Sequence, residues 1–185
     1  MILMCLICDE GEKVLDKREL NHLLIRIAKG DNSAFETFYL STRKGLYALL
    51  YPYFKNSYDT EDALEEVYIK VKQKAHLYQK NTDARAWVFQ VAKNYALNVL
   101  RSKNLEKEKL GEIALSQKES KDDKWNGTLF MVMQKTLTEE EYQIVIKHIL
   151  FYYKHKDIAK ELNLPLGTVL SKYQTALKKL RKELE

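Results

Sequence analysis

The chain has 185 residues, of which 45% are hydrophobic and 31% charged, a balance typical of a folded protein rather than a disordered one. Its formal net charge of +5 is consistent with nucleic acid as a partner but does not establish it. Six glycines and two prolines are too few for many strands and turns, and the apolar spacing is helical almost throughout. The sequence therefore predicts an all-α protein.

The first eight residues, MILMCLIC, are apolar but too short to cross a bilayer, and they lack the features of a signal peptide. We therefore expect a cytoplasmic protein without membrane insertion. Cys5 and Cys8 form a lone C-x-x-C pair with no second cluster to complete a zinc site, so we expect no metal and no cofactor. We expect residues 1–17 to form a poorly ordered head, and we hypothesise that translation naturally starts at Val14 or Leu15.

Four amphipathic helices are expected in the first half of the chain. The first covers residues 18–29, where the apolar residues fall on one helical stripe. The segment Gly30-Asp31-Asn32 ends it. Ser33 and Glu36 have the spacing of a capping box for the second helix, which runs toward Pro52.

The third helix, residues 59–75, begins with five acids within eight residues that hold no base. At about 100° per residue, Asp59, Asp62 and Glu66 share one side of the helix, with Ile69 beside them. An acidic surface next to an exposed isoleucine suits a basic protein partner better than DNA. The alternative is that these acids only complement the positive end of the helix dipole.

The fourth helix begins at Asp83, after a polar loop at residues 76–82, and ends near Arg101. Its aromatic residues are interleaved with cations: Trp87, Phe89 and Tyr95 with Arg85, Lys93, Arg101 and Lys103. This mixture suits single-stranded nucleic acid, because bases stack on rings while cations hold phosphates. The alternative is that Trp87, Val91 and Tyr95, which are spaced four residues apart, simply lie in the protein core.

The next segment changes character, since residues 102–127 balance six lysines against six acids and show no persistent apolar period. We expect a linker at residues 104–127. Helical periodicity resumes at residue 128. Thr138 and Glu141 have the spacing of a capping box for a helix that reaches about Tyr152.

Residues 156–180 have the pattern of a helix-turn-helix: a short helix, a tight turn and a longer basic helix. Ala159 is small where two helices would cross. Asn163 tolerates the positive φ that such a turn needs, and Pro165 cannot continue the first helix. From Val169 onward the apolar residues recur at steps of four and three, which marks a buried face.

The opposite face of the longer basic helix of this motif is polar and holds Thr168, Ser171, Lys172, Thr175 and Lys179. An ordinary helical hairpin with solvated lysines is the alternative. Between residues 154 and 182, however, there are eight Lys and Arg against two acids, a local excess that suits a phosphate backbone. The pattern favours a DNA-binding helix.

Three motifs in this order resemble the successive signatures of the sigma-70 family, and with two domains and a short linker the chain most resembles its extracytoplasmic-function (ECF) group. They are Asp59-x-Glu61-Asp62-x-x-x-Glu66-Val67, Arg85-x-Trp87-Val88-Phe89-x-Val91-Ala92-Lys93-Asn94 and Gly167-Thr168-Val169-x-Ser171. The likeness covers roughly residues 20–103 and 128–184.

The resemblance implies a fold of two small helical domains: a sigma region 2-like bundle at 18–103 and a region 4-like helix-turn-helix domain at 128–185, joined by a flexible linker. It implies a bacterial sigma factor, not an enzyme, that binds core RNA polymerase and directs promoter recognition, −10 melting and transcription initiation. In that family region 2 binds the β′ coiled coil and region 4 the β flap. Promoter DNA is the second expected partner and an anti-sigma factor a third.

Carried over position by position, the resemblance implies three sets of contacts. The polymerase contacts are Asp59, Asp62, Glu66 and Ile69. The contacts to the −10 element are Tyr78, Asn81, Arg85, Lys93, Asn94, Asn98 and Arg101, of which Tyr78 and Asn81 border a pocket for a flipped base. The contacts to the −35 element are Thr168, Ser171, Lys172, Thr175 and Lys179.

This chain departs from the family pattern at several positions. Glu65 stands where a glutamine is usual, and a tryptophan common late in that helix is replaced near Lys72. The last helix carries lysines where arginines are usual, and lysine lacks the bidentate fork that reads guanine. Two other interpretations stay open: a helix-turn-helix regulator that binds duplex operator DNA without polymerase, and a protein-interaction module that has lost its DNA affinity.

Overall fold

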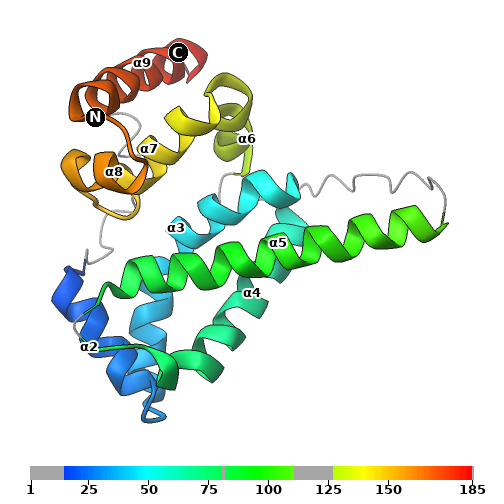
Figure 1. The fold of residues 1–185 in the computed structure, drawn as a ribbon, viewed down its shortest axis with the longest axis vertical. Coiled ribbons are helices and arrows are strands. Elements are labelled where there is room, and N and C mark those ends of the chain that lie inside the picture. The colour runs from blue at the N-terminus through cyan, green and yellow to red at the C-terminus, as the bar shows by residue number, and fades with distance from the viewer. Residues whose placement is uncertain (1–14, 81, 111–126, 185) are drawn as a thin grey trace. The chain divides into compact units, whose positions relative to one another are not determined.

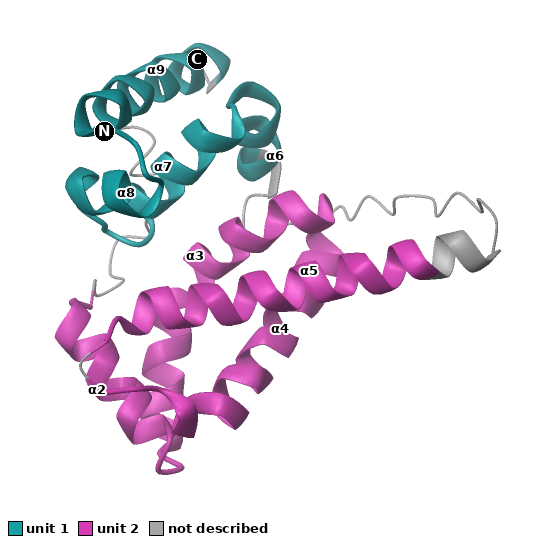
Figure 2. Cartoon of the chain, in the orientation of Figure 1, with its two compact units in different colours: residues 1–12, 124–185 teal, residues 13–123 magenta. Residues whose placement is uncertain are grey.

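The computed structural model describes residues 15–80, 82–110 and 127–184. These residues form helices and their connections, and no strand occurs among them, which confirms the predicted all-α class. Taken in chain order, the first compact unit lies within residues 15–110 (magenta, unit 2 in the key of Figure 2) and the second within residues 127–184 (teal, unit 1 in the key). No helix in the described part of the chain is long and apolar enough to span a membrane. The Cys5–Cys8 pair and the hypothetical start at Val14 lie outside the described residues.

The first unit is a bundle in which the long helices α3 and α5 pack against α2 and α4 (Figure 1). Its elements are α2 (Lys17–Ile27), α3 (Asn32–Phe54), α4 (Ser57–Lys74), the short 3₁₀ helix η1 (Ala75–Leu77) and α5 (Ala84–Leu110). Helix α5 extends beyond Arg101, the expected end, and enters the segment expected to be a linker. The expectation failed because no glycine or proline interrupts the chain between Arg101 and Leu110.

Side-chain caps mark where the helices of the first unit begin. Asp16 and Glu19 form a reciprocal capping box at α2, so this unit already includes residues that we expected in the head. The capping box expected at Ser33 is wrong, because Asp31 caps α3 by accepting a 3.0 Å hydrogen bond from the Ala34 N–H. That hydrogen bond, followed by those from Arg26 and Ser33, lowers the pKa of Asp31 to about 2. A carboxylate with three donors is the stronger cap.

The core of the first unit is apolar, and α5 enters it through small residues. Val88, Ala92 and Ala96 are fully buried at steps of four, which allows α5 to lie close to α3. Trp87 and Tyr95, which the core alternative placed on the buried face, are only half-buried beside it. Thr42 and Tyr68 add one buried polar link of 2.7 Å between α3 and α4.

The second unit contains α6 (Gly127–Thr136), α7 (Glu139–Ile149), α8 (His155–Glu161) and α9 (Leu166–Leu184). The capping box of Thr138 and Glu141 is confirmed at the start of α7. Helix α7 ends at Ile149, before the expected Tyr152, because Tyr152 adopts a φ of 54° and turns the chain toward α8. A residue with positive φ cannot continue a right-handed helix.

Helices α8 and α9 form the expected helix-turn-helix. Asn163 has a φ of 54°, and the Leu164 N–H donates to the Ala159 carbonyl at 2.9 Å, as in a Schellman turn. Ile158, Ala159 and Val169 are buried together with Ile144 of α7. This small core sets α9 against α7 and α8 and leaves its remaining sides for other contacts.

Candidate nucleic-acid and protein interfaces

The acidic face expected on α4 is present and exposed. Asp62 and Glu66 are exposed, Asp59 is half-buried, and Ile69 keeps 49% of its surface accessible. The charge of Asp59 is offset by Lys103 of α5, whose Nζ lies 3.2 Å from its carboxylate. Asp62 and Glu66 are therefore the acids most available to a partner.

One exposed aromatic residue belongs to the same face of α4 and was missed from the sequence. Tyr58 lies four residues before Asp62 and is 62% exposed. At about 100° per residue, Tyr58 and Ile69 fall on the same side as Asp62, at either end of the acids. The i to i+4 spacing was the available signal. The face thus combines negative charge with two apolar anchors.

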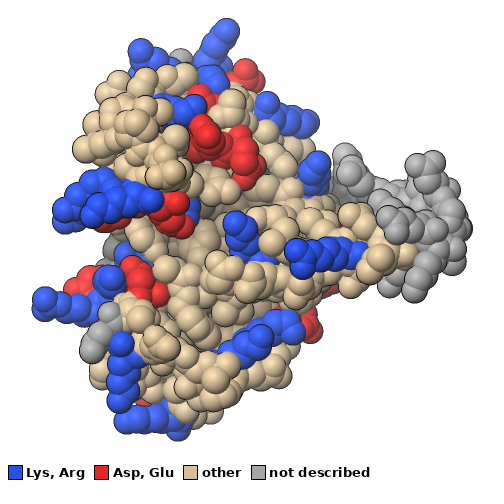
Figure 3. Space-filling view, in the orientation of Figure 1, with Lys and Arg blue, Asp and Glu red and all other residues tan. Residues whose placement is uncertain are grey.

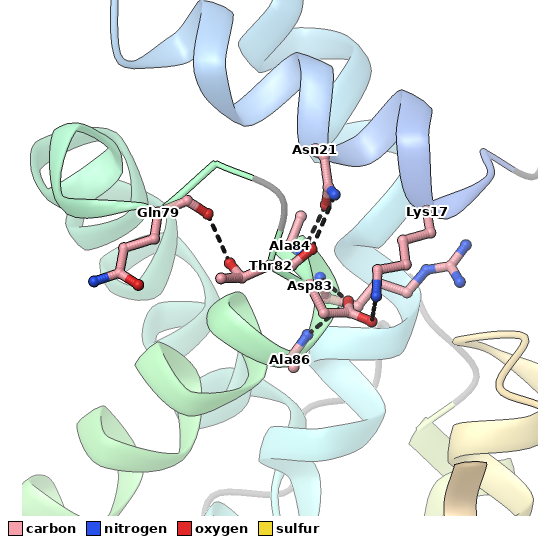
Figure 4. A network of polar contacts seen from close by, with 8 residues as sticks. Lys17, Asn21, Gln79, Thr82, Asp83, Ala84 and Ala86 are labelled. Carbon is pink, nitrogen blue, oxygen red and sulfur yellow. Dashed lines mark hydrogen bonds and ion pairs between the residues drawn. The ribbon is translucent and has the colours of Figure 1, made fainter.

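The loop that precedes α5 is held to α2 by a polar network (Figure 4). The Asn21 side chain donates to the Thr82 carbonyl at 3.0 Å and accepts from the Ala84 N–H at 2.9 Å. Lys17 lies 3.3 Å from the Asp83 carboxylate, which also accepts from the first N–H groups of α5. Asn21 was not among the expected site residues, because nothing local to α2 indicates a partner 61 residues away.

Of the residues expected at the flipped-base pocket, Asn81 lies outside the described residues. Tyr78 is 7% exposed, and its ring meets the edge of the Trp87 ring at a centroid distance of 5.8 Å. The Tyr78 hydroxyl is buried and has no hydrogen-bond partner among the described residues. Its neighbour Leu77 is 62% exposed. This end of the loop therefore offers an exposed apolar side chain next to the buried Tyr78, whose ring contacts the half-buried Trp87.

The structure distributes the five expected α5 residues over more than one face. Arg85 donates a hydrogen bond to the Leu15 carbonyl, which ties it to the chain before α2. Lys93, Asn94, Asn98 and Arg101 are exposed. At about 100° per residue, Asn94, Asn98 and Arg101 cluster, whereas Lys93 lies roughly 100° away from Asn94. Asparagines 94 and 98 are thus brought together, and Arg85 is not placed with them.

A groove of about 530 Å³ runs between α4 and α5 and includes both asparagines. Its lining also contains Tyr95, and Lys70 lies over the Tyr95 ring at 5.6 Å from the centroid. Burial, and then the charges of Glu66 and Asp62, raise the pKa of Tyr95, so this hydroxyl stays protonated at neutral pH. The groove is lined by cations (Lys70, Lys74 and Lys103) and amides, as phosphate and base contacts require.

The residues expected to contact the −35 element separate into two groups on α9. Ser171 and Thr175 are exposed and Thr168 is half-buried. Lys172 lies 3.0 Å from the Glu140 carboxylate, and the Lys179 Nζ donates to both oxygens of Glu141 at 2.9 and 2.8 Å. Burial acts to raise the pKa of Glu141, but the bonds from Lys179 and from the backbone of Thr138 outweigh it and lower the pKa. Both lysines therefore stabilise the contact between α7 and α9.

Other polar residues occupy the outermost side of α9 and were missed. Measured from the buried Val169 and Leu180, this side carries the expected residues Ser171 and Thr175 together with four exposed residues that were not expected: Gln174, Lys178, Arg181 and Lys182. A helical wheel centred on the buried residues would have found them. On the face drawn in Figure 3, basic side chains lie around α8 and α9, with acidic side chains among them, and follow α5.

These features define a class of protein: a helical DNA-binding protein with a helix-turn-helix in one unit and, in the other, an aromatic-rich bundle whose helix α4 carries an acidic face. Residues 38–106, which span most of α3, all of α4 and much of α5, match the Sigma-70 region 2 family. Among curated proteins, SigX of Bacillus subtilis (strain 168) is 23% identical over 82% of this chain and 84% of its own length. SigK of Mycobacterium ulcerans (strain Agy99) is 26% identical over 90% of this chain and 94% of its own length. Both are described as ECF RNA polymerase sigma factors.

Two solved structures share the fold. CnrH, solved in complex with the cytosolic domain of CnrY, has a TM-score of 0.58 at 15% identity and covers 90% of this chain and 97% of its own. RpoE of Bartonella quintana, solved with the anti-sigma factor NepR, has a TM-score of 0.52 at 14% identity with the same coverage. Residues 38–106 of this chain therefore match Sigma-70 region 2, and the chain is similar over most of its length to ECF RNA polymerase sigma factors.

Proposed function

We propose that this protein is an ECF-type sigma factor that binds core RNA polymerase through α4. It opens the −10 element with the loop before α5 and with the groove between α4 and α5. It binds the −35 duplex with α9. The observation that carries the proposal is the match to region 2, because it joins the acidic helix and the aromatic helix in one domain. The curated relatives favour this role over an operator-binding regulator. The protein acts by binding, and polymerase supplies the chemistry.

The polymerase contact consists of Asp62 and Glu66 with Tyr58 and Ile69 as apolar anchors. Interfaces derive most of their affinity from a few buried aromatic and aliphatic groups, while surrounding charges select the partner and speed association. An acidic face with two apolar ends fits a basic helical partner, and the family resemblance makes this the β′ coiled coil. Region 4 meets the β flap by the same resemblance. Since polymerase works in the cytoplasm, we place this protein there.

The −10 contact uses binding energy to separate the strands. The chain has no G-x-x-x-x-G-K-[ST] motif, so ATP does not drive the opening. Extruding a base costs about a few kcal/mol, which a prepared pocket offsets. The Asn21 network holds the loop in place before DNA arrives, which reduces the entropy lost on binding. The cations and amides of the α4–α5 groove then hold the exposed strand.

The −35 contact uses the outer side of α9, with Ser171 and Thr175 toward the bases and Lys178 and Lys182 toward phosphates. Lys172 and Lys179 support the helix from α7 and contribute little direct readout. An anti-sigma factor is the further partner that we propose. The relatives CnrH and RpoE were solved with protein partners of this kind or with a cytosolic partner domain.

Run-off transcription tests the proposal. Purified core polymerase is incubated with a promoter library, with and without the protein, and the transcripts are sequenced. We expect new start sites that share a −35 and a −10 element and that depend on the protein. Tight binding to a duplex operator without polymerase, combined with no new transcript, would show that the protein is an ordinary regulator.

A further inference from the structure

Two leucines at the start of α9 are exposed where the helix would enter DNA. Leu166 is 46% exposed and Leu170 is 40% exposed. They are four residues apart and therefore lie on the same side of the helix, next to the outer polar side that holds Gln174. Single exposed leucines are ordinary, but a pair in the first turns of a recognition helix is not, because these turns contact the base edges.

Gly167, between the two leucines, has no role in the fold that requires glycine. It does not adopt a positive φ, and a Cβ added to it would meet nothing within 4 Å. Glycine destabilises a helix relative to alanine, so the missing side chain needs another explanation. At about 100° per residue, Gly167 lies beside Leu170 on the outer polar side of α9, where the missing side chain lets another molecule approach the helix backbone closely.

The charges around the leucines identify the kind of molecule. From Leu166 to Lys182, α9 has five Lys and Arg and no acid. Three further lysines of the helix-turn-helix, Lys154, Lys156 and Lys160, are exposed. Cations on both helices match the phosphates that border the major groove. An apolar protein segment would explain the leucines but not this surrounding charge.

The only apolar group that a base edge presents in the major groove is the C5-methyl of thymine. We propose that Leu166 and Leu170 contact thymine methyl groups in the −35 duplex and are specificity-determining residues of this protein. The inference rests on the proposed function and adds the base that α9 selects. It also explains how a helix whose inner lysines are paired with α7 discriminates between sequences. Methyl contact replaces part of the arginine readout of guanine.

The test removes the methyl group alone. Holoenzyme made from the full-length protein and core polymerase is used to select a −35 element from a randomised library. Each thymine of that element is then replaced by deoxyuridine, which keeps base pairing and lacks the C5-methyl. Equilibrium binding of the holoenzyme is measured for the wild-type protein, for Leu166→Ala and for Leu170→Ala. Lys178→Ala serves as the matched control.

We expect the selected element to contain thymine, and at least one deoxyuridine replacement to weaken binding about fourfold, the effect of one buried CH₂-sized group. Each leucine variant should lose a similar factor on the thymine duplex and show no further loss with deoxyuridine at its partner position. Lys178→Ala should weaken binding to every duplex and keep the deoxyuridine effect. Circular dichroism should be unchanged, since both leucines are exposed.

Three results overturn the inference while the proposed function stands: a selected element without thymine, leucine variants that bind as the wild type does, or leucine variants that lose affinity and still respond fully to deoxyuridine. The last result would make the leucines part of a protein interface. If the protein supports no new transcript on any promoter, the proposed function itself fails and the inference fails with it.

Discussion

The adjacent residues Lys178 and Lys179 provide the sharpest test of how α9 works. Lys179 donates to both carboxylate oxygens of Glu141 at 2.9 and 2.8 Å, and the Glu141 side chain is only 7% exposed. Lys178 is exposed on the outer side of the helix. We therefore expect Lys179→Ala to destabilise the second unit and Lys178→Ala to leave its stability unchanged.

The magnitude follows from the carboxylate left behind. A hydrogen bond to a charged group contributes about 1.5–3 kcal/mol, and truncating one partner leaves the other without compensation. Because the Lys179 side chain is 38% exposed, solvent screens part of this interaction. We expect the free energy of unfolding to fall by about 1–2 kcal/mol in Lys179→Ala. Hydrogen exchange of α7 and α9 amides in the full-length protein at pH 7 measures this loss locally.

The pH dependence has a defined sign. The pKa of Glu141 in the folded protein is lower than its ordinary value of 4.5. A depressed carboxyl pKa stabilises the fold above the unfolded pKa, and this contribution disappears as the pH falls through the folded value. The difference in free energy of unfolding between wild type and Lys179→Ala should therefore be largest at pH 7 and shrink below pH 4.5. Urea unfolding at a series of pH values measures it. Equal stability of the two lysine variants at pH 7, or a difference that persists in strong acid, would refute the reasoning.

Three further changes test other parts of the structure. Asn163→Ala should destabilise the helix-turn-helix by about 1 kcal/mol in chemical unfolding, because alanine tolerates the φ of 54° poorly. Asn21→Ala removes both bonds that hold the loop before α5, so we expect slower promoter opening, measured by permanganate footprinting, with −35 binding intact. Charge reversal at Asp62 and Glu66 should abolish binding to core polymerase in a pull-down, with the circular dichroism spectrum unchanged.

Each of these changes has a matched control. Asn163→Gly should be neutral or stabilising, and equal losses for glycine and alanine would remove the positive φ as the cause. His22→Ala alters the exposed neighbour of Asn21 and should open promoters at the wild-type rate. Glu36→Lys reverses one exposed charge on α3 and is compared with Glu66→Lys, which makes the same charge change on α4; loss of polymerase binding in Glu36→Lys would mean that net charge rather than the α4 face decides the contact.

Much of the fold was readable because its signals are local. The stripe of apolar residues in α2, the capping box at Thr138 and the left-handed Asn163 each depend on residues within one or two turns. The acidic face of α4 also follows from spacing along one helix. The expected positions of helix ends were less accurate where two capping residues compete, as Asp31 and Ser33 do at the start of α3.

The sequence by itself determined two helical units, a helix-turn-helix and an acidic face, since periodicity and turn chemistry act over a few residues. Only the tertiary structure decided which polar side chains pair with a residue of another helix and which stay exposed. Lys179 faces Glu141 because the buried side of α9 packs against α7, and Asn21 reaches a loop 61 residues away because α2 lies beside it. A charge on a helix can be counted from the sequence, but its partner on another helix depends on how the two pack. That pairing separates the lysines that hold the fold from those that remain for DNA.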